Sequence, residues 1–315
     1  MNDINLLYCF DSGYDKQTFV SIYSILSKIE ETVVNIFIIH KNPETFEKYR
    51  LEILKNKKIG NIEIYQFDKN ISNYPNLSKK HVSEATYYRL FISDYLPDNL
   101  EEVIYIDSDV YCLSAPDSIF KNTFKNMKLE NRTIGVSTEI IKESPDHDLF
   151  KNLKMDQSKY FNAGVMFIDY KKWLERTSVH DFLNLVKTYA NKIIFWDQDI
   201  LNKKFDGDYF EIDEGLNYRN LDKIEFPNNN KSIVLLHYVG NQKPWSIEGG
   251  FQDRSKIYFE YYQKAFNKKY HFEIKKNRVN SMSQLMKHIF TLNFLNAKYP
   301  SIYIFESLKT IFKPK

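Results

Sequence analysis

Short apolar segments recur along the chain and alternate with segments whose apolar residues have helical spacing. The apolar runs are typical of buried strands and cover residues 4–10, 33–40, 62–67, 103–106, 133–137, 163–168 and 233–237. Two intervening segments have the spacing of one helix face, namely Phe19, Ile22, Tyr23 and Leu26, and residues 83–94. This alternation predicts an α/β domain with a Rossmann-like, mostly parallel sheet flanked by helices.

Polar side chains stand where several of these predicted strands end. Asp11 follows the first run, Asp107 follows the fourth, and His237 closes the last. In open α/β sheets, ligands bind beyond the carboxyl ends of the strands, where the strand order reverses. The sequence therefore predicts a functional site at that edge of the sheet.

The composition is that of a folded protein with a large core. The chain has 315 residues, of which 43% are hydrophobic and 27% are charged. No stretch approaches the roughly 20 apolar residues that cross a bilayer, and the first residues lack the layout of a signal peptide. We therefore expect a cytoplasmic protein. Cys9 and Cys112 both lie in predicted buried strands, so we expect no disulfide framework.

Positive charge is concentrated at the end of the chain. Residues 260–315 contain eleven Lys and Arg against three Glu, a net charge of +8, whereas the whole chain carries +3, so the rest carries −5. We therefore expect a main domain over residues 1–260 and a basic C-terminal helical extension over residues 261–315.

The basic extension also has apolar residues at helical spacing. They form two sets, Met282, Leu285, Met286, Ile289 and Phe290, and then Phe305, Leu308, Ile311 and Phe312. Such basic amphipathic segments are typical of peripheral attachment to an anionic membrane surface, and we expect no nucleic-acid partner. The same pattern arises when helices pack on a main domain with a solvated basic face, so both interpretations stay open.

The segment Asp107-Ser108-Asp109 indicates a divalent-cation site. Two carboxylates at positions i and i+2 reach one ion only where the chain leaves regular pleating, and these follow a buried strand. Carboxylates suit hard cations such as Mg²⁺, and an imidazole ligand moves the preference toward Mn²⁺. The alternative is a helix cap or a turn, because aspartate is common in both.

Two other cation-dependent interpretations of this pair can be tested on the sequence. An EF-hand loop starting at Asp107 needs glycine and an acid where the chain has Cys112 and Ser118, so it is excluded. A Mg²⁺-dependent haloacid-dehalogenase-like phosphatase also uses Asp-x-Asp after a strand, and Asp208 and Asp213 would supply its later acidic pair. It remains an alternative, although it leaves the segments after residue 160 unexplained.

Six segments, taken in order, resemble glycosyltransferase family 8 over residues 1 to about 260, particularly bacterial lipopolysaccharide and lipooligosaccharide galactosyl- and glucosyltransferases. The segments are Phe10–Tyr14, His81–Arg89, Tyr105–Asp109, Tyr160–Val165, Trp196–Asn202 and His237–Trp245. The resemblance implies a GT-A fold and a retaining transferase that moves galactose or glucose from a UDP-sugar. It also implies Mn²⁺ as cofactor, with Mg²⁺ as the alternative. The implied acceptor is lipopolysaccharide, lipooligosaccharide or another bacterial surface glycan, and we expect it to be lipid-linked.

The resemblance also implies a role for individual residues. Asp107, Asp109 and His237 match the family's metal ligands, and Gly240 and Lys243 match positions that contact the diphosphate. The other matches to the UDP-sugar site are Asp11 and Tyr14 at its uridine end, and Arg89, Ser108, Asn162, Asp197, Gln198 and His81 nearer the sugar, where Asp107 also contributes. Gly13 departs from the family, which usually has an asparagine there, so recognition of the uridine differs in detail.

Asp197 and Gln198 are the candidate catalytic residues. Either would be the nucleophile of a double displacement. An amide is a poor nucleophile, so the alternative is front-face attack by the acceptor, with the departing phosphate taking its proton. A nucleotide-sugar-binding protein without turnover is the non-enzyme alternative. The complete metal triad disfavours it, because a pure binder has no leaving group to neutralise.

Overall fold

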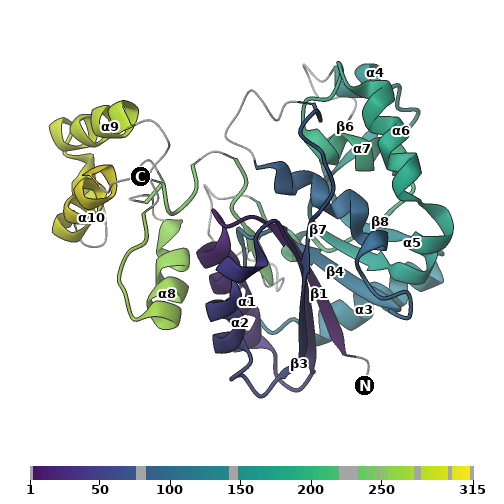
Figure 1. The fold of residues 1–315 in the computed structure, drawn as a ribbon, viewed down its shortest axis with the longest axis horizontal. Coiled ribbons are helices and arrows are strands. Elements are labelled where there is room, and N and C mark those ends of the chain that lie inside the picture. The colour runs from purple at the N-terminus through teal and green to yellow at the C-terminus, as the bar shows by residue number, and fades with distance from the viewer. Residues whose placement is uncertain are drawn as a thin grey trace.

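A computed structural model describes residues 3–75, 83–141, 148–219, 233–240, 242–246, 249–250, 252, 254–272, 278–296 and 300–312. Within these residues, a seven-stranded sheet has the strand order β3-β2-β1-β4-β7-β6-β8 (Figure 1). Its strands are β1 (Ile4–Phe10), β2 (Val34–His40), β3 (Ile59–Gln66), β4 (Glu102–Ile106), β6 (Ile134–Ile141), β7 (Lys159–Asp169) and β8 (Phe210–Glu211).

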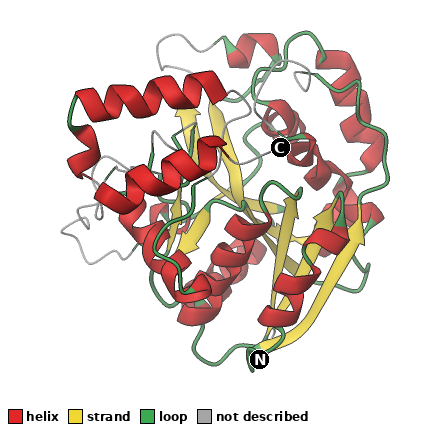
Figure 2. Ribbon diagram, turned by 60° about the vertical axis from the view of Figure 1, so that its left-hand side comes forward, coloured by secondary structure: helices red, strands yellow, loops and turns green. Residues whose placement is uncertain are grey.

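Helices cover both faces of this sheet (Figure 2). One face packs against α1 (Asp15–Lys28), α2 (Glu47–Ile53) and α3 (Asp117–Leu129). The other packs against the 3₁₀ helix η2 (Glu84–Asp94) and against α4 (Leu149–Asn152), α5 (Tyr170–Arg176), α6 (Val179–Tyr189) and α7 (Trp196–Phe205). Short 3₁₀ turns lie at η1 (Pro43–Thr45), η3 (Glu214–Leu216) and η4 (Asn293–Asn296).

The two covered faces explain why the strands are continuous apolar runs. In β1, Leu6 and Tyr8 belong to the core beneath α1, whereas Leu7 and Cys9 belong to the core beneath η2. A strand that is buried on both sides needs apolar residues at successive positions rather than at alternate ones. Cys9 and Cys112 are both buried and free.

Most strand pairs are parallel, which confirms the expected sheet. β3, β2, β1 and β4 run parallel to one another, and β8 runs parallel to β6. β7 is antiparallel to both of its neighbours, β4 and β6. The first residues of β7 therefore lie beside the carboxyl end of β4, and the Asp107 backbone N–H donates to the Gly164 carbonyl at 2.8 Å.

Several expected strands differ in their bounds from the observed ones: β3 begins at Ile59 rather than at 62, β6 ends at Ile141 rather than at 137, and two others bear on the site. β7 begins at Lys159 rather than at 163, because residues 159–162 also pair with β6. This pairing contains register shifts, so the segment lacks the regular pattern by which a strand is predicted from sequence. The last expected strand is shortened to β9 (Leu235–His237) and lies outside the main sheet, where it pairs antiparallel with β5 (Val110–Cys112). The segment at residues 83–94 forms a 3₁₀ helix.

Three further helices follow the last strand: α8 (Ser255–Phe266), α9 (Arg278–Phe290) and α10 (Pro300–Phe312). Aromatic side chains of α8 pack with Val20 of α1 and Tyr111 of β5 in a third core cluster. Residue 260, the expected boundary, lies inside α8, and the division of the chain there remains a prediction. Figure 1 shows α9 and α10 at one end of the molecule, beyond α8. In the described part of the chain, no helix is both long and apolar enough to span a bilayer.

Packing of α3 against the sheet can be tested at Phe167. Its ring on β7 meets Phe120 and Phe124 of α3 at centroid distances of 5.3 and 5.2 Å. Phe167→Ala should lower the free energy of unfolding by about 3–5 kcal/mol, since it leaves a cavity in a buried cluster. Urea denaturation measures the change. Leu129→Ala is the control because Leu129 ends α3 and is 76% exposed, and it should cost less than about 0.5 kcal/mol. Equal effects of the two substitutions would contradict this packing.

Candidate metal and donor site

Backbone pairing brings the two aspartates and the histidine together. Asp107 and Asp109 lie in the turn between β4 and β5, and His237 ends β9. Val110 pairs with His237 across the two-stranded sheet, and the Tyr238 N–H donates to the Asp109 carbonyl at 3.0 Å. Residues about 130 positions apart in the chain are thereby fixed at one edge of the main sheet.

The three side chains form a compact cluster. His237 Nε2 lies 3.3 Å from Asp109 Oδ1 and 3.9 Å from Asp107 Oδ2, and the potential ligand atoms lie within 4.8 Å of one another. Asp109 Oδ1 is buried and has no hydrogen-bond partner among the described residues. A buried carboxylate oxygen without a partner is costly, so two carboxylates and an imidazole in this arrangement fit a divalent cation.

Gly164 leaves the space that this cluster needs. A Cβ atom at this position would lie 2.1 Å from His237 Cε1 and 2.9 Å from Asp107 Oδ2. Neither approach is sterically possible without moving a candidate ligand. The glycine of the Asn-Ala-Gly segment is therefore explained by the close packing of the histidine against β7.

Lys243 contacts the buried member of the cluster. Its ammonium forms an ion pair with Asp109 Oδ2 and donates to the Tyr238 carbonyl at 2.5 Å. Burial alone would raise the pKa of Asp109, but the charges of Lys243 and His237 outweigh it and hold the pKa below its ordinary value. Asp109 is therefore ionised at neutral pH, as a metal ligand must be.

A second charged group lies beside the cluster. Arg89 of η2 is buried and places Nε 2.5 Å from Asp197 Oδ2 and Nη1 3.5 Å from Asp107 Oδ1. Thr86 donates to the other oxygen of Asp197. Burial raises the pKa of Asp197 to about 6, although Arg89 and Thr86 act in the opposite direction. The guanidinium thus connects a candidate metal ligand to a candidate catalytic residue.

Gln198 and Asn162 share one carboxylate partner. Glu139 Oε2 accepts from Gln198 Nε2 at 3.2 Å and from Asn162 Nδ2 at 3.3 Å. The Gln198 amide oxygen accepts from the Ala163 N–H at 3.0 Å. Both ends of the Gln198 amide are therefore engaged, and its oxygen is directed at the backbone of β7.

Asp11 and Tyr14 follow the carboxyl end of β1, and their role at the uridine end stays a prediction. Asp11 accepts from the Gly13 N–H at 2.8 Å and from the Ser83 hydroxyl. The Tyr14 ring stands edge-on to the Trp245 ring, with 6.1 Å between centroids. Ser108 is buried and accepts from the Thr18 hydroxyl of α1 at 2.7 Å.

Gly240 and His81 are the two remaining residues of the expected donor site. Gly240 is exposed and has a φ of +80°, and a Cβ there would meet no atom within 4 Å. The left-handed backbone, rather than crowding, therefore favours glycine at this position. His81 lies outside the described residues.

Several site residues were not predicted from the sequence. Glu139, Thr86 and Asn217 all bond to candidate site residues. Thr86 lies within the His81–Arg89 segment but was not singled out there, and Glu139 and Asn217 belong to none of the six segments. Glu139 had one available signal, because it ends a polar run, Ser137-Thr138-Glu139, inside a strand with apolar residues at both ends. Trp196, which directly precedes Asp197, has a φ of +51°. This is a strained backbone conformation for a bulky residue.

Comparison with known proteins shows extended similarity. The sequence model of Glycosyl transferase family 8 matches residues 5–249. General stress protein A of Bacillus subtilis is 22% identical over 275 residues, 82% of this chain and 92% of that protein. Lipopolysaccharide 1,3-galactosyltransferase of Salmonella typhimurium is 26% identical, covering 78% and 74% of the two chains. Lipopolysaccharide 1,2-glucosyltransferase of Escherichia coli is 27% identical, covering 76% and 73%.

A solved structure has the same fold. The galactosyltransferase LgtC, crystallised with donor and acceptor sugar analogues, superposes with a TM-score of 0.69 and 22% sequence identity. The alignment covers 83% of this chain and 96% of LgtC. This likeness confirms the expected GT-A fold, and the match over residues 5–249 shows that the chain belongs to glycosyltransferase family 8.

Proposed function

We propose that this glycosyltransferase is a retaining, Mn²⁺-dependent enzyme that transfers galactose or glucose from a UDP-sugar to a bacterial surface glycan. The cluster of Asp107, Asp109 and His237 supports this proposal most directly. Lipopolysaccharide is the acceptor named for two of the relatives, and we propose an acceptor of that class, lipid-linked, for this chain. Two carboxylates with one imidazole favour Mn²⁺, with Mg²⁺ as the alternative.

In this proposal the cluster holds a cation that neutralises the leaving UDP, which stabilises the charge that develops as the glycosidic bond breaks. Asp107, Asp109 and His237 would be its protein ligands. Lys243 would exchange Asp109 for a phosphate oxygen, and the open space at Gly240 would admit the diphosphate. Asp11 and Tyr14 would bind the uridine, and Arg89, Ser108, Asn162, Asp197 and Gln198 the sugar end.

The hydrogen bonds around the candidate nucleophiles favour front-face attack. Asp197 is buried, ion-paired with Arg89 and hydrogen-bonded to Thr86, and the Gln198 oxygen accepts from the Ala163 N–H. To attack the anomeric carbon, either side chain would have to give up one of these contacts. We therefore propose that the acceptor hydroxyl attacks on the face from which UDP departs. The C–O bond to UDP breaks, the new glycosidic bond forms, and a phosphate oxygen takes the proton.

The phosphatase interpretation has less support. Asp208, one member of its second acidic pair, forms ion pairs with Arg132 and Arg176. Asp213 accepts from the Gly215 N–H at 2.8 Å. Within the described residues, neither joins the metal-ligand cluster, so these two acids do not complete that kind of Mg²⁺ site.

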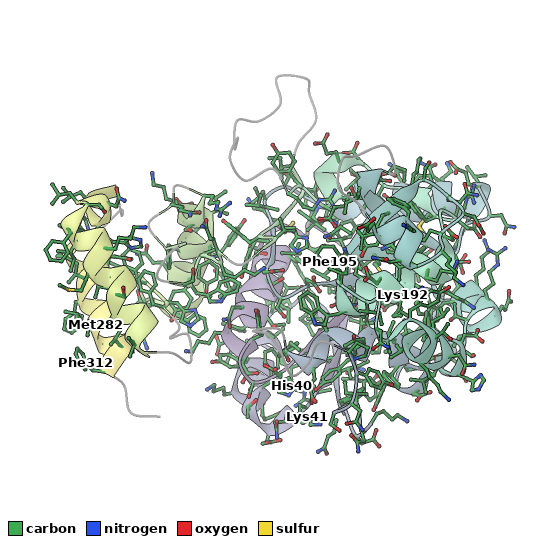
Figure 3. All side chains as sticks on the ribbon, turned by 90° about the horizontal axis from the view of Figure 1, so that it is seen from above. His40, Lys41, Lys192, Phe195, Met282 and Phe312 are labelled. Atoms are coloured by element: carbon green, nitrogen blue, oxygen red, sulfur yellow. The ribbon has the colours of Figure 1, made fainter. Side chains whose placement is uncertain are left out.

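The helices at the end of the chain support attachment to an anionic lipid surface. Leu285, Tyr303 and Ile311 are buried in the third core cluster, so one side of this helical pair is already covered. Phe290, Phe305 and Phe312 are nevertheless 79%, 64% and 66% exposed. Figure 3 shows Phe312 and Met282 on these helices, far from Phe195 beside the donor site. We propose that exposed rings and the net charge of +8 in residues 260–315 bind membrane.

Asp109→Asn tests the metal site. Loss of a charged ligand should weaken Mn²⁺ binding, measured by calorimetry with UDP present, by more than about tenfold. Mn²⁺-dependent hydrolysis of UDP-galactose or UDP-glucose should fall in parallel, and a chelator should abolish it in the native protein. Asp68→Asn, on an exposed loop, is the matched control and should change neither quantity. If the native protein binds no UDP-sugar with Mn²⁺ present, the proposed function is wrong.

Asp197→Asn tests the buried ion pair. Arg89 would remain buried without its charged partner at 2.5 Å, so the free energy of unfolding should drop by about 3 kcal/mol. Asp181→Asn breaks an exposed pair with Lys204 at 2.9 Å and should cost less than about 1 kcal/mol. Urea denaturation of the two variants measures the difference. Similar losses would mean that Arg89 does not depend on Asp197.

The membrane proposal can be tested in the full-length chain. Phe290→Glu combined with Phe305→Glu should abolish sedimentation with phosphatidylglycerol vesicles, because charged side chains are poorly accommodated at the acyl boundary. UDP-sugar hydrolysis should be unchanged. Leu129→Glu, equally exposed on the main domain, should sediment like the native protein. Unchanged sedimentation of the double variant would mean that these helices serve packing alone.

A further inference from the structure

A hydrogen-bonded chain connects the candidate metal site to the candidate sugar site through Asn217. His237 Nδ1 lies 2.9 Å from Asn217 Oδ1. Asn217 Nδ2 donates to Asn162 Oδ1 at 3.1 Å, and the same oxygen accepts from the Gly164 N–H at 3.0 Å. No sequence motif indicated Asn217.

The donor and the acceptor of every bond in this series of hydrogen bonds follow from one backbone group. The Gly164 N–H can only donate, so the Asn162 atom that faces it is the amide oxygen. Asn217 must then present its NH₂ group to Asn162, and its own oxygen to His237. An oxygen acceptor requires a proton on His237 Nδ1. In the neutral ring the unprotonated nitrogen is therefore Nε2, which is the one that faces Asp107 and Asp109.

The surroundings prevent these amides from finding other partners. Asn217 is 1% exposed, and Asn162 and His237 are also buried. The backbone next to Asn217 is tied to the strand that carries His237, since Tyr218 N–H donates to the Leu235 carbonyl and His237 N–H to the Tyr218 carbonyl, both at 2.9 Å. A buried polar group that lost its partner here would have no water to replace it.

We infer that Asn217 is a positioning residue that holds His237 in the Nδ1–H tautomer and directs the Nε2 lone pair at the cation site. This inference rests on the proposed function for the identity of the cation. Asn217 also orients Asn162, whose NH₂ group donates to Glu139, the carboxylate that binds Gln198. A side chain absent from every recognised motif thus sets the orientation of groups at both ends of the donor site.

Nitrogen NMR of the imidazole rings tests the tautomer without any metal. The chain has seven histidines, and the signals missing from His237→Gln identify those of His237. In its neutral form, the His237 ring of the native protein should show a protonated Nδ1 and a bare Nε2. A protonated Nε2 would overturn the inference.

Two variants separate positioning from simple packing. Asn217→Leu keeps the volume but removes both bonds, so His237 should lose its fixed tautomer and Mn²⁺ affinity, measured with UDP present, should fall about 10–100-fold. Asn217→Asp keeps an oxygen facing Nδ1–H, so it should retain the tautomer and recover most of the affinity. Folding of each variant is checked by circular dichroism.

Thr123→Val is the matched control, because it removes a buried side-chain bond within α3, far along the sequence from the site. It should change neither the tautomer nor the affinity. A folded Asn217→Leu protein with native tautomer and affinity would contradict the inference. If the native protein binds no Mn²⁺, the proposed function fails, and the NMR measurement still decides the role of Asn217.

Discussion

The reversed direction of β7 is the constraint on which the site depends. Because β7 runs antiparallel to β4, its early residues meet the carboxyl end of β4, where the Asp107 N–H bonds to the Gly164 carbonyl. A parallel strand in that position would bring its late residues there instead. The single bond at 2.8 Å therefore aligns a candidate metal ligand with the Asn162-Ala163-Gly164 segment, and the remaining contacts of the site are built around it.

Two layers of interaction are assembled on this alignment. The inner layer is ionic: Asp107 lies near Arg89, which is paired with Asp197, and Asp109 is paired with Lys243. The outer layer consists of the amide side chains of the site and Glu139. Their hydrogen bonds determine the orientation of neighbouring side chains. The ionic contacts balance the charges of buried groups. The amides determine which neighbouring group donates and which accepts, because each amide has one donor end and one acceptor end.

The apolar runs were enough to predict the mostly parallel α/β sheet. Asp107, Asp109 and His237 were singled out from the sequence, and the structure brings them together; that they bind a metal stays a prediction. Helix η2 was expected only as a helical pattern, since its 3₁₀ geometry depends on packing over β1. Asn217, Glu139 and Thr86 escaped prediction for a different reason. Their partners lie between 20 and 111 positions away, so the local sequence does not show which side chains they contact. Only the three-dimensional pairing of strands gives these side chains their roles.

The ion pair between Lys243 and Asp109 has a thermodynamic consequence. An entering cation must compete with an ammonium that already balances the buried carboxylate, so the cation alone gains less from that ligand. An anion that pairs with Lys243 would leave the Asp109 carboxylate free to bind the cation. The affinity of the site for the cation would then rise. By linkage, the cation raises the affinity for the anion by the same factor. Under the proposed function, the lysine would therefore make the cation and the anionic ligand bind cooperatively, and each would bind less tightly without the other.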